Sequence, residues 1–218
     1  MALFLVALLP LFFLLLAWLP WGHRNTPEMS FLVGTFFKGI LAFFPGFVVI
    51  LIFRKIFGFS YDGFLLFLSL LQRDHFFPLL VAVGSLLVLK SNLQVLGTEE
   101  ECFLGFFSFL AGFMTVMNIA DLIRTWGNWN AYLLFLLPIQ RLSVLLFVSL
   151  TARRFFPWEG RNGILLLSVA AIMAIGFTVP AILVFLNREG WSVLLTVLPL
   201  LVAMLWFTMR FPRVVRAQ

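Results

Sequence analysis

Charged residues and metal-ligating side chains are scarce in this sequence. Only 11% of its 218 residues are charged, and it has one cysteine, Cys102, and two histidines, His23 and His75. One cysteine excludes an intramolecular disulfide, a CxxC redox pair and a thiolate metal cluster. Two histidines without a carboxylate-rich helical spacing do not form a convincing zinc or haem site. We therefore predict no metal site and no cofactor.

Motifs of known intramembrane chemistry are also missing. Gly84-Ser85 lacks the following glycine of a GxSxG-like setting, and no histidine follows His75, which excludes a rhomboid-like serine protease. The glutamates at 99–101 lack the arginine that a CAAX-processing protease carries four positions after its second glutamate. Without a P-loop, ATP-driven work would require a separate subunit. These absences favour a function without catalysis of its own.

Apolar residues dominate what is present. Hydrophobic residues make up 63% of the chain, 29 residues are phenylalanine, and the mean hydropathy is +1.10. A soluble domain carries roughly 25% charged residues and cannot bury so much apolar surface. We therefore predict one integral-membrane domain over residues 1–218, an all-α polytopic transmembrane helix bundle, with no separate soluble domain.

The net charge of +6 would suggest nucleic acid as the partner of a soluble protein. Here the basic residues fall mostly at the ends of apolar runs, where they set orientation and meet anionic lipid. We therefore expect a lipid bilayer, and no nucleic acid, as the partner of this charge. The predicted location is the cell membrane, as a multi-pass protein, and we assume a bacterial-type inner membrane.

Eight apolar runs mark the predicted spans. Most of them reach the roughly 20 residues that a helix needs to cross the hydrocarbon of a bilayer. The runs cover residues 2–21, 31–53, 59–71, 76–96, 102–123, 131–150, 164–186 and 191–209.

The runs 59–71 and 76–96 are ambiguous, because the first is short and the charged sequence QRDH separates them. Two arrangements remain open: eight spans, or six spans plus a membrane-dipping hairpin at 59–96. The positive-inside rule places the basic clusters at 54–55, 153–161 and 210–216 in the cytoplasm. Both arrangements satisfy this rule with cytoplasmic N- and C-termini, whereas seven spans do not.

Polar residues interrupt the apolar pattern at the end of the fifth run, in the stretch MNIADLIRTWGNWN. At 100° per residue, Asn118 and Asp121 fall on one helix face, with Arg124 on its flank. The next run carries Gln140 and Arg141 deep inside it, where an arginine needs an interior partner. We expect Asp121 to pair with Arg141, and Asn118 and Gln140 to be further acceptors. A structural lock between helices and a ligand-binding cavity both remain open.

Lys38 is a second intramembrane base, too deep in its run to reach the interface comfortably. It either joins Arg141 in an anion-attracting cavity or reaches the interface alone. The polar cluster predicted to bind a ligand or a partner comprises Asp121, Arg141, Asn118, Arg124, Lys38 and Gln140.

These features favour a non-catalytic integral-membrane subunit of a transport or cell-envelope assembly, which packs against other membrane-protein subunits and carries a buried polar site. One alternative is a small carrier, or an energy-coupling solute-binding component, for an anionic or zwitterionic solute. Another is an intramembrane lipid-modifying enzyme that uses Asp121 or a loop glutamate as its acid or base.

Overall fold

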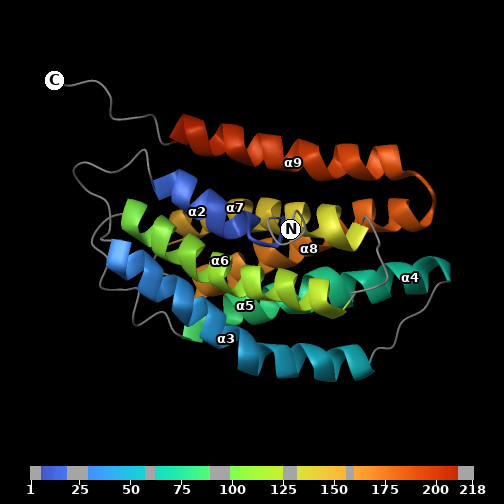
Figure 1. The fold of residues 1–218 in the computed structure, drawn as a ribbon, viewed down its shortest axis with the longest axis horizontal. Coiled ribbons are helices and arrows are strands. Elements are labelled where there is room, and N and C mark those ends of the chain that lie inside the picture. Colours follow the sequence, from blue (N-terminus) through green and yellow to red (C-terminus); the bar gives the residue numbers. More distant parts are fainter. Residues whose placement is uncertain are drawn as a thin grey trace.

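A computed structural model describes residues 6–18, 29–56, 62–88, 99–124, 132–155 and 160–210. All regular secondary structure in these ranges is helical, and six helices are long and apolar enough to cross a membrane. They lie side by side in a bundle (Figure 1). The prediction of an all-α multi-pass membrane protein is therefore confirmed. The elements are α2 (Leu9–Trp18), α3 (Met29–Ile56), α4 (Gly63–Leu70), η2 (Leu71–Phe76), α5 (Phe77–Val88), α6 (Glu99–Arg124), η4 (Tyr132–Leu136), α7 (Leu137–Arg154), α8 (Arg161–Phe185) and α9 (Glu189–Arg210).

Helices α6 and α7 form the centre of the bundle. In the most apolar windows of these two spans, 83% and 72% of the residues are buried, against 22% in α3, 33% in α8 and 17% in α9. Figure 1 shows α3 and α9 at opposite edges, with α6 and α7 between them. Polar side chains on the inner two helices therefore face protein, while the outer faces of α3, α8 and α9 are open to lipid or to another protein.

The stretch from Gly63 to Val88 forms one continuous helix, made of α4, η2 and α5. Its charged residues Arg73 and Asp74 lie in the middle of this helix, not in a loop. Both predicted arrangements of 59–96 are therefore wrong over the described residues 62–88, which contain neither a break between two spans nor a hairpin turn. The charged sequence QRDH does not form a surface loop, because residues inside the bundle make hydrogen bonds with some of its polar side chains.

Two prolines account for the π-helical form of η2 and η4. A proline has no N–H group, and its ring crowds the carbonyl four residues earlier. Pro78 and Pro138 each stand two residues after a π-helical segment ends. The wider turn accommodates this crowding, and the N–H of Phe77 accordingly donates to the carbonyl of Gln72, five residues earlier. Each proline thus lies within a continuous helix and does not end it.

Helices α3 and α6 approach most closely at two glycines. A methyl group on Gly39 would collide with the carbonyl of Phe109, and one on Gly112 would collide with the carbonyl of Phe36. In lipid, where no hydrophobic force drives helices together, small residues of this kind permit close backbone packing. This crossing holds α3 against the central helix and leaves its opposite side uncovered.

The basic clusters at 54–55 and 153–161 lie at opposite ends of the bundle, and all of the cluster at 210–216 except Arg210 lies outside the described residues. Three candidate spans, Gly63–Val88, Phe103–Arg124 and Leu134–Ala152, separate the cluster at 54–55 from the one at 153–161. Because three crossings change sides, the expectation that all three clusters share the cytoplasmic side is wrong. The ends of α7 and α9 do lie together, opposite to the end of α3 (Figure 1). The cytoplasmic placement of that shared end and of both termini stays a prediction.

Candidate functional site

An ion pair joins α6 and α7 inside the bundle. Nη2 of Arg141 donates to Oδ2 of Asp121 at 2.6 Å, and Nη1 of Arg141 donates to Oδ1 of Asn118 at 2.7 Å. All three residues are buried, and Arg141 is only 3% exposed. Arg141 lies further from the end of its span than Asp121 does, and the long arginine side chain covers this difference. The expected contact is therefore present, while a role for it in binding a ligand or a partner stays a prediction.

Asp121 is held from two sides. Its Oδ1 lies 3.1 Å from Nη2 of Arg124, which is partly exposed near the end of α6. Oδ1 of Asn118 accepts from Arg141, and Nδ2 of Asn118 donates to the carbonyl of Ala7, two residues before α2, at 3.3 Å. A buried ion pair offsets the cost of its desolvation only when such additional hydrogen bonds are made. The network therefore fixes α6, α7 and the residues just before α2 relative to one another.

Two predicted members of the cluster lie elsewhere. Gln140 is fully buried, but its Nε2 donates to the hydroxyl of Thr196 in α9 at 3.0 Å. Lys38 is exposed on the outer face of α3. The structure brings neither residue into the Asp121–Arg141 pair. A lysine at the centre of a membrane helix costs about 2.5–3.5 kcal/mol on insertion scales, so the position of Lys38 needs an explanation of its own.

The structure adds polar residues that the sequence reasoning missed. Asp74 and His75 lie on η2 and are 1% and 5% exposed. Oδ1 of Asp74 accepts from Nε of Arg73 at 2.9 Å, and Nε2 of His75 lies 3.2 Å from the hydroxyl of Tyr132 on η4. Single π-helical turns within α-helices occur frequently at functional sites. The signal in the sequence is Pro78, which follows the charged residues inside an apolar stretch.

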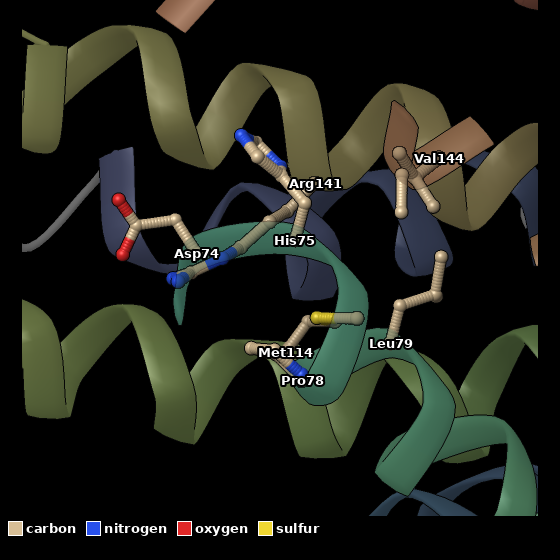
Figure 2. A pocket seen from close by; sticks show the side chains of 8 residues that line it. Asp74, His75, Pro78, Leu79, Met114, Arg141 and Val144 are labelled. Carbon is tan, nitrogen blue, oxygen red and sulfur yellow. The ribbon is translucent and has the colours of Figure 1, made fainter. Parts of the chain in front are cut away.

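A small cavity separates η2 from α7. Figure 2 shows Asp74, His75 and Pro78 on the η2–α5 segment and Arg141 extending from α7 toward the same space. The cavity volume is about 10 Å³, which holds roughly one water molecule. Oδ2 of Asp74 and Nε of Arg141 are buried and have no hydrogen-bond partner among the described residues. The lining residues are Asp74, His75, Pro78, Leu79, Met114, Arg141, Val144 and Ala174.

Asp121 is not placed to act as a general base. Both carboxylate oxygens of Asp121 interact with arginines, which occupies the lone pairs that a general base would use. Within the described ranges, no group of three or more His, Cys, Asp or Glu side chains is placed to hold a metal ion. The site has fixed charges of both signs around one small cavity, with a donor and an acceptor that no described residue pairs with.

No protein-family model, no curated protein and no solved structure matches this chain. Its function is therefore inferred from its own residues and their geometry.

Proposed function

We propose that the protein is a non-catalytic integral-membrane subunit of a transport or cell-envelope assembly, and that its buried polar cluster is a working site. The observation that carries this proposal is the Asp121–Arg141 pair in the centre of the bundle, with Arg141 lining the same cavity as Asp74. Ionisable residues inside a membrane domain are rare, and they mark ligand sites or pathways more often than not.

A structural lock would need fewer groups than the site contains. The bonds from Arg141 to Asp121 and Asn118 already join α6 to α7. The cavity adds an oxygen of Asp74 and Nε of Arg141, neither of which has a hydrogen-bond partner among the described residues. An unsatisfied buried polar group costs about 1–3 kcal/mol, and more when it is charged. A core that serves only stability gains nothing from these two atoms, which supports a site that binds a polar group during its work.

The outer faces of the bundle support membership of an assembly. Large apolar side chains are exposed along α3, α8 and α9, as in any lipid-facing helix. Lys38 interrupts this apolar surface, because it stands exposed among Phe37, Leu41 and Phe44. Contact with lipid would leave its ammonium group unsatisfied, whereas contact with a neighbouring protein supplies an acceptor.

Native mass spectrometry of the protein extracted from its own membrane tests the proposal. We expect the 24.9 kDa chain to appear with at least one other membrane protein in a fixed ratio. Release of the chain only as a monomer or homo-oligomer with lipid would contradict membership of an assembly. The same spectrum reports any small molecule that remains bound.

The cavity favours a second candidate, a small carrier or solute-binding component for a zwitterionic solute. An ammonium group would pair with Asp74 and a carboxylate with Arg141, whose facing atoms have no partner among the described residues. The cavity of about 10 Å³ is far smaller than ligand pockets of roughly 300–1,000 Å³, so binding would require η2 and α7 to move apart.

Equilibrium dialysis of the purified chain with labelled amino acids tests this second candidate. Binding should be lost in Asp74→Asn and retained in Asp62→Asn, a matched change of an exposed carboxylate at the start of α4. Absence of binding to every amino acid tested, together with no retained solute, would contradict a carrier of this class.

A further inference from the structure

We propose that the outer face of α3 around Lys38 docks a transmembrane helix of a different protein, and that this helix carries a carboxylate at the depth of Lys38. The inference rests on the proposed function, because it names the surface and the chemistry by which a partner in the assembly is held.

A continuous stripe of exposed residues runs along α3, on the side away from the bundle. Residues three or four apart lie on one face of a helix. A methyl group on Gly34 would meet no atom within 4 Å, so a second backbone has room to approach there. Figure 1 shows α3 at the edge of the bundle, with α5 and α6 on one side of it. The stripe consists of Gly34, Lys38, Leu41, Pro45, Val48 and Ile52.

Lys38 lies deep within the hydrocarbon. It is roughly 13 Å from the start of its own candidate span, Met29–Phe53, at 1.5 Å per residue. Its neighbour Gly39 meets Phe109 of α6, which is itself roughly 9 Å from the start of Phe103–Arg124. Both measures place the lysine well below the head groups. A four-carbon stem brings its ammonium group only part of the way to the interface, so an acceptor within the membrane is required.

The positive charge of Lys38 calls for a negatively charged acceptor. The positions of the chain's own carboxylates show where this acceptor must come from. Among the described side chains, Asp74 and Asp121 are buried beside arginines. Asp62 and Glu189 stand at the starts of α4 and α9, near one end of the bundle. No exposed carboxylate in the described part of the chain therefore lies at the depth of Lys38. A symmetric pair of two copies would leave both lysines unsatisfied, whereas a different chain with Asp or Glu inside its span pairs with Lys38.

Site-specific photo-crosslinking tests this docking face. Benzoyl-phenylalanine at position 41, about one turn from Lys38 and 67% exposed as leucine, is introduced into the full chain in its native cells. We expect a crosslink to one membrane protein that carries Asp or Glu inside a predicted span. Lys38→Met should lower the yield of this crosslink by about tenfold or more. Lys55→Met, a matched change of an exposed lysine near the end of α3, should leave the yield unchanged.

Charge exchange completes the test. Lys38→Glu should abolish the crosslink, and replacing the acidic residue of the identified partner by lysine should restore it in the Lys38→Glu background. Lys38→Met should remain monodisperse in detergent, because no described carboxylate pairs with Lys38. Aggregation of Lys38→Met would show that the lysine supports the fold, and would count against a docking role.

Three further results would overturn the inference: a crosslink to lipid alone, a crosslink only to a second copy, and a crosslink that Lys38→Met does not weaken. A parallel probe at Leu201 on α9, at the opposite edge of the bundle, separates this inference from the proposed function. A protein captured from α9 but not from α3 would leave the assembly role standing and remove only the docking face. Capture of no protein from either position would contradict both.

Discussion

The Nε2 atom of His75 lies 3.2 Å from the hydroxyl oxygen of Tyr132, and this hydrogen bond joins two π-helical segments that are 57 residues apart in the chain. Each segment is a widened turn in front of a proline, Pro78 or Pro138. The bond is buried, and His75 also lines the cavity that Asp74 and Arg141 share. The polar interior is therefore built where two local distortions of neighbouring helices meet.

Tyr132→Phe should lower the free energy of unfolding by about 1–3 kcal/mol, because it leaves a buried nitrogen of His75 without this hydrogen bond. Thermal unfolding of the protein in detergent measures the change. Ser168→Ala is the control, since that hydroxyl bonds only a carbonyl of its own helix on an exposed face. An equal, small effect of both substitutions would show that the link between η2 and η4 contributes nothing to stability.

A cysteine at position 74 should resist impermeant maleimides from both sides of the membrane, in a chain from which Cys102 has been removed. The reason is that Asp74 is 1% exposed and borders a cavity of about 10 Å³. Asp62→Cys, at an exposed position, should react and serves as the control. Ready labelling at position 74 would restore the arrangement in which QRDH forms a surface loop.

Cysteines at positions 154 and 187 should be labelled from opposite sides of the membrane, because the single helix α8 separates them. The positive-inside rule predicts position 154 inside, with the basic residues at the end of α7, the start of α8 and the end of α9. Labelling of both from one side would contradict the order of spans. Labelling of position 154 from outside would contradict only the orientation.

Gly39→Ala should destabilise the bundle by about 1–3 kcal/mol, since the added methyl group meets a backbone carbonyl of α6 that cannot move aside as a side chain does. Gly34→Ala adds the same group to the same helix with no atom within 4 Å, and should be neutral or slightly stabilising. The fraction of protein that remains folded after heating in detergent compares the two. Equal behaviour of both variants would contradict the close approach of α3 and α6.

The fold class and the central ion pair were predictable from the sequence. Composition alone requires a membrane bundle, and Asp121 and Arg141 stand on consecutive helices where each needs a partner inside the protein. The partner of Gln140 was not predictable, because Thr196 lies on a helix far away in the chain, and local spacing does not show which helices pack together.

The course of residues 63–88 was not predictable by the same reasoning. Periodicity and charge count favour a loop wherever Arg73, Asp74 and His75 interrupt an apolar run. Whether such a run continues as one helix depends on whether tertiary neighbours satisfy its polar groups. Here Tyr132 bonds His75, and a π turn accommodates Pro78. The prediction that all basic clusters share one side failed for the same reason, because it counted this single helix either as two crossings or as a hairpin with none.

A double-mutant cycle with Asp121→Asn and Arg141→Gln tests the central claim, that the buried pair is a working site and not only a lock between helices. Each single change leaves one buried charge uncompensated and should cost about 3–5 kcal/mol of stability, while the double change should cost less than the sum. We predict that the double variant regains folded yield in detergent but does not regain the partner found by native mass spectrometry. Recovery of both the yield and the partner would show that the pair only locks the helices, and would contradict the account.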